Sequence, residues 1–417
     1  MDIILSDDLD GRFYDFEEFE NIKAVKDILE NVKISGDKAV FEYCRKFDNL
    51  DINELEISDD LIRKYYDELD KKVVDSLRKA SENIRCFAEK QFSQLNDFET
   101  VISNNKLGQK IVPIETVGCY VPGGRYPLPS SVLMSVIPAK VAGVKEIIVC
   151  SPNITPVTIV AATIAGADKI FNIGGVQAIG AMAFGTESVP KVDKIVGPGN
   201  KYVNAAKKEL YGFVGIDFIA GPSEVLIVAD ETASPEIVAA DLLAQAEHDP
   251  DSRPDLITTS ENLAYEVKRN IDLQLNNLKT SEIAEKALKN GKIVIVKSIN
   301  QAIEIANKRA PEHLELFLNN PRQFINYFRN YGSLFLGEFS PEVLGDYCSG
   351  TNHTLPTNGT ARFTGGLSVF NFVKILTYQE ISKIGFSDLE EIAKLLAEIE
   401  GLDAHKKAVE LRKTSDD

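Results

Sequence analysis

The chain has 417 residues, of which 44% are hydrophobic and 26% are charged, a balance typical of a soluble globular protein. That length predicts two or three domains with cores of their own. The formal net charge of -17 and a pI near 4.9 disfavour nucleic acid or an anionic membrane as the main partner, because both bind basic surfaces.

The lack of a visible targeting signal and the pattern of cysteines both favour a cytoplasmic location. The acidic N-terminus has no basic region followed by an apolar one, and no window approaches the ~18 apolar residues of a membrane span. The cysteines are odd in number, scattered and without a Cys-x-x-Cys pair, which indicates reduced thiols: Cys44, Cys86, Cys119, Cys150 and Cys348. Cys119 adjoins a glycine-rich turn and could be a nucleophile. A small buried strand residue is the favoured interpretation, since no histidine or cation is near it in sequence.

Residues 1–105 are expected to be mostly helical. Apolar residues recur at helical spacing, with charges between them, in residues 19–48 and again in 75–92. The sequence Ile-Ser-Gly-Asp at 34–37 predicts a break between two helices.

From about residue 106, short β-rich runs alternate with helical stretches. The first series of strands is predicted within 117–122, 146–152, 169–175 and 192–197. The second series is predicted within 223–230, 254–260, 292–296 and 332–337. Helices are predicted between them, among others within 234–248 and 299–310. Such alternation predicts mostly parallel sheets flanked by helices, an α/β fold.

Four parts are therefore expected along the chain. They are an N-terminal helical region at 1–105, a first α/β domain at 106–222, a second α/β domain at 223–375 and a helical tail at 376–417. The tail is too short to bury a core, so it is expected to pack on another domain or another subunit.

The chain is sparing with histidine, and each histidine has carboxylates or amides as sequence neighbours. The four are His248, His313, His353 and His405. Any one of them alone is better explained as an ordinary core or surface residue, because metal binding and acid/base chemistry are minority uses of imidazole. The recurrence of this setting at all four favours a functional site.

Two of these histidines suggest a metal site together with an amide and a carboxylate. Gln245 and His248 lie three residues apart on a predicted helix, so both can face one ion. An imidazole near a helix C-terminus also suits the helix dipole, so a structural role is equally open. Asp346 and His353 flank a glycine-rich stretch, and His405 lies on the tail. Gln245, His248, Asp346 and His405 would offer two nitrogen and two oxygen donors, a set suited to zinc or another divalent ion.

Glu312 and His313 are adjacent and follow Pro311. At a helix start or a turn, both side chains could face one cleft and act as two separate proton acceptors. A helix-capping glutamate beside an incidental histidine is an equally good interpretation.

Glycine-rich turns follow three of the predicted strands, at 121–129, 172–180 and 196–203. Such turns hold ligands in many α/β folds, but none completes the G-x-G-x-x-G dinucleotide pattern. For each glycine singly, a tight turn is the better explanation.

Taken together, these stretches resemble the histidinol dehydrogenase family. The similar segments run in order from about residue 117 to 412: YVPGGRYPLPSSVLM, GGVQAIGAMAFGT, DKIVGPGNKYV, GPSEVLIVAD, DLLAQAEHDPDS, APEHLEL, GDYCSGTNHTLPT and AHKKAVELR. Segments of this length are highly specific, and no departure from the family pattern falls at a position named here.

The resemblance implies a zinc-dependent, NAD-linked, four-electron oxidation of L-histidinol to L-histidine through bound L-histidinal. It implies zinc ligands at Gln245, His248, Asp346 and His405, and an acid/base pair at Glu312 and His313. Substrate contacts are implied for Ser223, His353 and Glu400, in addition to the ligands and bases. NAD contacts are implied for Tyr120, Gln177 and Asn200.

The resemblance also implies a homodimer of subunits with two incomplete Rossmann-like domains. The tail would cross to the partner, so that His405 and Glu400 complete the other subunit's site. Two other classes remain open on the residues alone. One is a zinc hydrolase in which Glu312 activates water, and the other is a metal-stabilised binding protein without catalysis.

Overall fold

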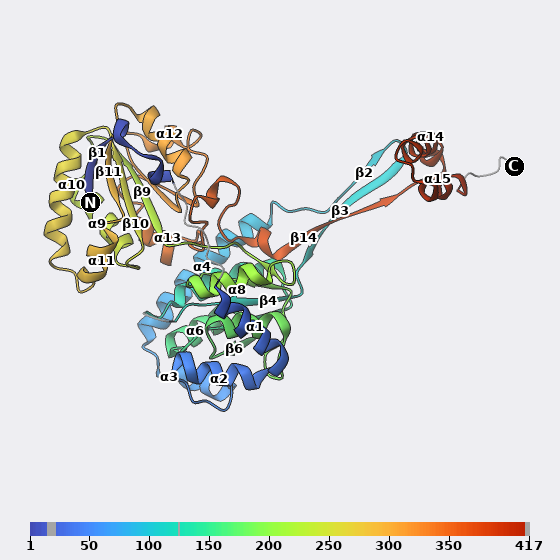
Figure 1. Ribbon diagram of the computed structural model, residues 1–417, viewed down its shortest axis with the longest axis horizontal. Coiled ribbons are helices and arrows are strands. Elements are labelled where there is room, and N and C mark those ends of the chain that lie inside the picture. The colour runs from blue at the N-terminus through green and yellow to red at the C-terminus, as the bar shows by residue number, and fades with distance from the viewer. Residues whose placement is uncertain (15–21, 124–125, 413–417) are drawn as a thin grey trace. The chain divides into compact units, whose positions relative to one another are not determined.

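The computed structural model describes residues 1–14, 22–123 and 126–412 (Figure 1). The chain divides into two compact units. Unit 1 comprises Met1–Lys90 and Ile114–Phe372, and unit 2 comprises Gln91–Pro113 and Val373–Asp417. Two parallel sheets with flanking helices make up unit 1, which confirms the expected α/β class.

The first sheet of unit 1 has five parallel strands in the order β6-β5-β4-β7-β8. Their bounds are β4 Thr116–Tyr120, β5 Glu146–Cys150, β6 Lys169–Phe171, β7 Lys194–Val196 and β8 Gly215–Ile216. The chain runs from β4 outward to β6, then returns beside β4 to form β7 and β8. The point at which the strand order reverses therefore lies between β4 and β7, at whose carboxyl ends α/β folds commonly bind ligands.

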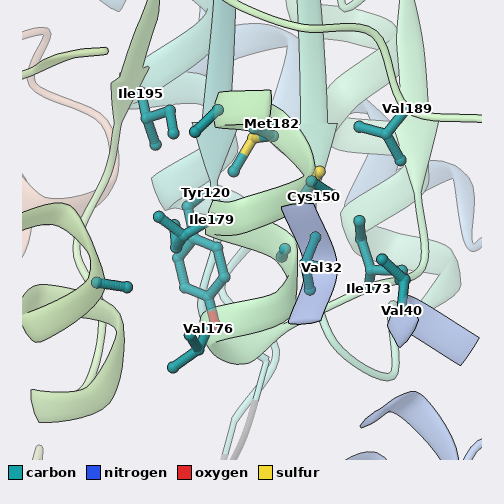
Figure 2. Packing of buried hydrophobic residues seen from close by; sticks show 14 of the residues in the cluster. Val32, Val40, Tyr120, Cys150, Ile173, Val176, Ile179, Met182, Val189 and Ile195 are labelled. Atoms are coloured by element: carbon teal, nitrogen blue, oxygen red, sulfur yellow. The ribbon is translucent and has the colours of Figure 1, made fainter. Parts of the chain in front are cut away.

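Helices cover both faces of this sheet. The helices of this part of the chain are α1 Lys23–Ser35, α2 Asp37–Asp48, α3 Asp59–Glu68, α4 Lys71–Phe92, α5 Pro129–Ala142, α6 Pro156–Ala165, α7 Gly175–Phe184 and α8 Lys201–Leu210, of which α5 and α7 contact the strands directly. Figure 2 shows one face, where Val32 of α1 packs with Ile179 and Met182 of α7 over Tyr120. The helices α1 and α2 are therefore part of the first domain's core. Gly36, at φ +54°, makes the predicted break between α1 and α2.

The second sheet has six parallel strands in the order β1-β11-β10-β9-β12-β13. Their bounds are β1 Asp2–Leu5, β9 Glu224–Ala229, β10 Arg253–Thr258, β11 Lys292–Ile295, β12 His313–Phe317 and β13 Ser333–Leu336. On one face pack α9 Pro235–Ala246, α10 Glu261–Leu275 and α11 Ser281–Ala287, and on the other α12 Ile299–Arg309. The strand β1 was not expected, because residues 1–105 were predicted to be mostly helical. It adds the first residues of the chain to the edge of this sheet.

Unit 2 contains a three-stranded antiparallel sheet in the order β14-β3-β2, followed by two helices. The elements are β2 Phe98–Ile102, β3 Asn105–Pro113, β14 Val373–Glu380, α14 Lys383–Ile399 and α15 Asp403–Glu410. The expectation of helix from residue 376 is wrong for its first residues, since Leu376 to Glu380 pair with β3. In the described part of the chain, no helix combines the length and apolar character needed to span a bilayer.

Candidate active site

One end of α9 brings Gln245 and His248 to the amino ends of the strands of the second sheet. The helix ends at Ala246, so Gln245 lies in its last turn and His248 follows it in the chain. Gln245 is 1% exposed, whereas His248 is exposed. The surrounding protein lowers the pKa of His248 mainly by desolvation, and the nearby carboxylate of Asp346 opposes this effect. A neutral imidazole is the form that binds a metal.

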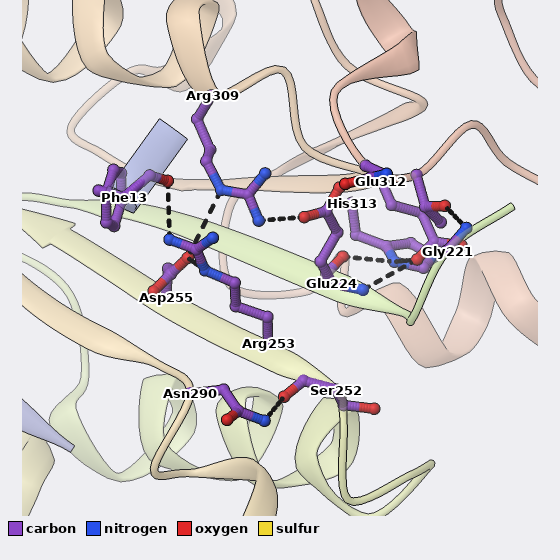
Figure 3. A network of polar contacts seen from close by, with 12 residues as sticks. Phe13, Gly221, Glu224, Ser252, Arg253, Asp255, Asn290, Arg309, Glu312 and His313 are labelled. Atoms are coloured by element: carbon purple, nitrogen blue, oxygen red, sulfur yellow. Dashed lines mark hydrogen bonds and ion pairs between the residues drawn. The ribbon is translucent and has the colours of Figure 1, made fainter. Parts of the chain in front are cut away.

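Glu312 and His313 lie where the chain enters strand β12, not at a helix start. His313 is the first residue of β12, and both side chains are buried. The capping interpretation of Glu312 is therefore wrong. The backbone N–H of Glu224, the first residue of β9, donates to Glu312 Oε2 at 2.9 Å. The Nδ1 atom of His313 lies 3.2 Å from the carbonyl oxygen of Glu224 (Figure 3).

The glycine-rich stretch after β13 brings Asp346 and His353 together. Asp346 lies on the short helix α13 Glu342–Tyr347, and its backbone carbonyl is 2.7 Å from His353 Nδ1. The other ring nitrogen of His353 is 3.1 Å from the Ser131 hydroxyl on α5. Both nitrogens of His353 thus contact protein groups, which fixes the ring at the junction of the two α/β domains of unit 1.

Three carboxylates surround His313. Its Nδ1 lies 3.7 Å from both Glu312 Oε2 and Glu342 Oε2, and its Nε2 lies 3.6 Å from Asp346 Oδ1. Burial alone would lower the pKa of His313, but Glu312, Asp346 and Glu342 outweigh it and raise this pKa well above its ordinary value. Burial raises the pKa of Glu312 to about 8 and that of Glu342 to about 8. The site therefore has an excess of acidic groups that a cation would balance.

The donor set beside these acids fits a metal ion. Gln245 Oε1 is buried and has no hydrogen-bond partner among the described residues, a costly state unless a ligand satisfies it. The pKa of Asp346 is lowered although burial acts against this, because the ring of His313 lies beside its carboxylate and its positive form favours the ionised carboxylate. An ionised carboxylate, an unsatisfied amide oxygen and an imidazole are ligands that zinc accepts. The described residues contain no group of three or more His, Cys, Asp or Glu side chains arranged for a metal. Of the four expected zinc ligands, unit 1 supplies only His248 and Asp346 as residues of these types, because Gln245 is an amide and His405 belongs to unit 2.

The expected NAD contacts lie around the first sheet's reversal point. Tyr120 ends β4, and its hydroxyl accepts a hydrogen bond from Gly175 N–H at 3.1 Å. Gln177 is 1% exposed and donates to Asp48 Oδ2 at 3.1 Å. Burial raises the pKa of Tyr120 to about 12, so its hydroxyl keeps its proton and can still donate. Tyr120 therefore supports the start of α7, whereas Gln177 ties α7 to the end of α2.

Asn200 lies beyond the carboxyl end of β7 and is the N-cap of α8. Its Oδ1 accepts from Tyr202 N–H at 3.0 Å and from Val203 N–H at 3.1 Å. Asn200 is exposed, so its amide N–H groups can reach a ligand. Gly197, at φ +114°, approaches the Tyr120 carbonyl so closely that a Cβ would lie 2.1 Å from its oxygen. This turn therefore needs glycine for its own packing.

The remaining expected residues divide between the two units. Ser223 precedes β9 and is half-buried beside Glu224. Glu400 and His405 belong to unit 2, at the end of α14 and on α15, and both are exposed.

Several residues of this site were not singled out from the sequence. Glu224, Arg309 and Glu342 are charged residues that are almost completely buried around His313. The one available signal was a carboxylate at the start of an otherwise apolar strand, "EVLIVA". Arg309 ends α12, where a basic residue is expected for its favourable interaction with the helix dipole, so nothing marked it as exceptional.

Comparisons with known proteins point to a single family. A family model described as Histidinol dehydrogenase matches residues 15–413. A histidinol dehydrogenase of Methanococcus maripaludis is 53% identical over 94% of this chain and 93% of its own length. One of Methanocaldococcus jannaschii is 48% identical over 95% and 93%. A crystal structure of histidinol dehydrogenase from Elizabethkingia anophelis is similar with a TM-score of 0.92 and 41% identity, covering 96% of this chain and 94% of that one.

Proposed function

The chain belongs to the histidinol dehydrogenase family and is an oxidoreductase that oxidises histidinol in histidine biosynthesis, and from this we propose a zinc-dependent, NAD-linked, four-electron oxidation of L-histidinol to L-histidine. One observation carries the finer chemistry. Two buried bases, Glu312 and His313, lie next to Asp346 in a site whose buried amide oxygen, on Gln245, has no protein partner among the described residues.

The bound groups would be held by the two α/β domains. Gln245, His248 and Asp346, with His405 from the partner subunit, would hold one zinc ion in the segment 223–375. Tyr120, Gln177 and Asn200, in the segment 106–222, would contact NAD at the reversal point between β4 and β7. When bound, zinc would fix the substrate and NAD would accept hydride.

The two bases would serve different steps. His313 would accept the proton of the substrate hydroxyl in the first oxidation, because its Nδ1 faces the Glu224 carbonyl and its Nε2 has no hydrogen-bond partner within the described chain. Glu312 would take a proton from the water that hydrates the bound aldehyde before the second oxidation. Ser223, His353 and Glu400 would contact the substrate and hold it while the reactive aldehyde is present.

We propose that the tail of unit 2 acts in a homodimer. α14 carries exposed apolar side chains along its length, including Ile384 at 68%, Ile392 at 57% and Ile399 at 72% exposed. A helix of this kind is costly to leave in water and suits burial against a partner. In such a dimer Glu400 and His405 would complete the site of the other subunit.

One assay tests the proposal against its nearest alternative. The purified protein is mixed with zinc, NAD and L-histidinol, and absorbance of NADH is followed together with the histidine formed. Two NADH per histidine are expected, because the oxidation removes four electrons. A zinc hydrolase that uses Glu312 would cleave an ester or amide without NAD and would form no NADH. Absence of NADH formation with zinc-loaded protein would contradict the proposal.

A further inference from the structure

The backbone of Glu224 contacts both bases at once. Its N–H donates to Glu312 Oε2 at 2.9 Å, and its carbonyl oxygen lies 3.2 Å from His313 Nδ1 (Figure 3). A carbonyl oxygen only accepts hydrogen bonds, so Nδ1 of His313 must carry the hydrogen. In the neutral ring this leaves the lone pair on Nε2. That atom lies 3.6 Å from Asp346 Oδ1, beyond hydrogen-bond distance, and is free to accept a proton.

The side chain of Glu224 is held at both oxygens. Oε1 accepts from the backbone N–H of Asn358 at 3.0 Å, and Oε2 forms an ion pair with Arg309. The side chains of Glu224 and Arg309 are only 5% and 4% exposed. Arg309 Nε also lies 3.9 Å from Asp255 Oδ2. A buried carboxylate with charged and backbone partners has little freedom to change its rotamer.

This anchor matters because Glu224 is the first residue of β9. Its N–H donates to Glu312 and not to a neighbouring strand, and the residues before it lie outside the sheet. The two consecutive peptide groups of Glu224 that orient the bases therefore lie at the end of a strand, where side-chain contacts help to fix them. We infer that Glu224 is a positioning residue for both oxidation steps, with Arg309 as its anchor. This inference rests on the proposed function and extends it.

A purely structural ion pair is the competing explanation. Buried ion pairs contribute little net stability compared with apolar residues of similar size, so their presence alone assigns no role. The two explanations differ in what a perturbation does. A structural pair affects the free energy of unfolding, whereas a positioning residue affects the rate through the two bases.

The first test is Glu224→Gln. Glutamine keeps the shape of the side chain, but its NH2 group replaces one acceptor oxygen and faces the donors on Asn358 or Arg309. We expect kcat to fall about 10- to 100-fold for oxidation of L-histidinol and also of supplied L-histidinal, because the backbone of one residue orients the bases of both steps. KM for L-histidinol and bound zinc should stay unchanged.

The matched control is Arg253→Met. Arg253 pairs with Glu224 through the backbone of β10 and β9 and belongs to the same network through Asp255, at 3.0 Å, but its side chain makes no hydrogen bond or ion pair with Glu224 or the bases in the described structure. It should lower thermal stability and keep kcat.

Double variants separate the two explanations further. In the His313→Ala background, Glu224→Gln should cause no additional loss in the first hydride transfer, because the base that it orients is absent. A structural effect would instead multiply the two losses. If Glu224→Gln does not fold, Arg309→Lys and Arg309→Met replace it. Lysine keeps a cation beside Glu224 and should retain more of kcat than methionine does.

A spectroscopic measurement is independent of turnover. With only four histidines, the ring nitrogens can be assigned from ¹H–¹⁵N spectra, with His313→Ala identifying the signal of interest. We expect the neutral ring to be protonated at Nδ1. If unmodified protein forms no NADH, the proposed function fails and this spectrum still decides the Glu224 contact. A ring protonated at Nε2, or a Glu224→Gln protein with unchanged kcat on both substrates, would overturn the inference.

Discussion

His248 is the one proposed zinc ligand of unit 1 that is exposed, so it is the ligand most open to exchange with solvent. We expect His248→Asn to lose zinc on dialysis and to lose histidinol oxidation, while its circular dichroism stays that of the unmodified protein. Asparagine has no ring nitrogen to replace the imidazole. The adjacent variant Glu247→Gln is the control, because Glu247 Oε2 is bound to the Thr280 hydroxyl instead. Full zinc content in His248→Asn would rule His248 out as a ligand.

The second prediction at this scale concerns the division of labour between the bases. Glu312→Gln should slow formation of histidine but spare the first hydride transfer, whereas His313→Ala should slow the first transfer itself. General-base losses are typically ~100- to 10,000-fold. Single-turnover NADH formation measures the first transfer, and supplied L-histidinal measures the second. Equal losses of both steps in both variants would refute separate roles.

The cysteines give a third prediction at the residue scale. Burial raises the pKa of Cys44 to about 12 and also raises the pKa values of Cys119 and Cys150. Only the thiolate reacts, and a raised pKa lowers its fraction at any given pH. At pH 8 an alkylating reagent should therefore label the exposed Cys86 first and these three only after denaturation. Mass spectrometry of the labelled peptides checks the order. Early labelling of Cys119 with loss of activity would support a nucleophilic role for Cys119.

At the scale of elements, Asn200 combines a cap with a proposed NAD contact. Asn200→Ala removes the acceptor for two N–H groups of α8 and should lower the free energy of unfolding by about 1 kcal/mol. Asn200→Asp keeps the acceptor but loses the amide donor. It should keep stability and raise KM for NAD. Urea denaturation and initial rates measure the two effects separately. If Asn200→Asp leaves KM unchanged, Asn200 is a cap alone.

The elements that the sequence predicted well are those with a local signal. The helices α1 and α2 follow from apolar spacing and Gly36, and β9 to β11 follow from apolar runs bounded by polar turns. The strands that were missed depend on distant partners. β12 reads "HLELF", which mixes two ionisable residues into five positions, and it is a strand because β9 and β13 flank it. β14 looked like part of the charged tail, and pairing with β3 makes it a strand.

The residues of the candidate site also fall into those that the sequence could indicate and those that it could not. Residues inside long similar segments, such as Gln245 and Asp346, could be named from the sequence because the resemblance is specific there. Glu224 and Arg309 could not, since they are 85 residues apart and their ion pair exists only once α12 lies beside the start of β9. Charge that is buried by the fold leaves no periodic pattern in the sequence.

At the scale of the whole molecule, the proposed sharing of active sites predicts complementation. His405→Ala in one subunit and Glu312→Gln in the other place both lesions in one site of a mixed dimer and none in the other. Random mixing gives about half mixed dimers, so roughly a quarter of the unmodified activity should return.

Mixed and refolded variants are assayed for histidine formation after native mass spectrometry has established the mixed dimers. Mixing either variant with itself is the control. Proven mixed dimers that remain as inactive as each parent would show that His405 serves its own subunit.

The pairing of β1 with β11 has a consequence for synthesis on the ribosome. Asp2–Leu5 emerge before the rest of the second sheet, and their partners, Lys292–Ile295, are made almost three hundred residues later. Meanwhile α1, α2 and the first sheet can assemble from residues already present, because their contacts lie before residue 217. The opening strand must therefore stay unpaired while the first domain folds behind it. An N-terminal fusion that sequesters these four residues should delay completion of the second sheet, and with it the site, without affecting the first.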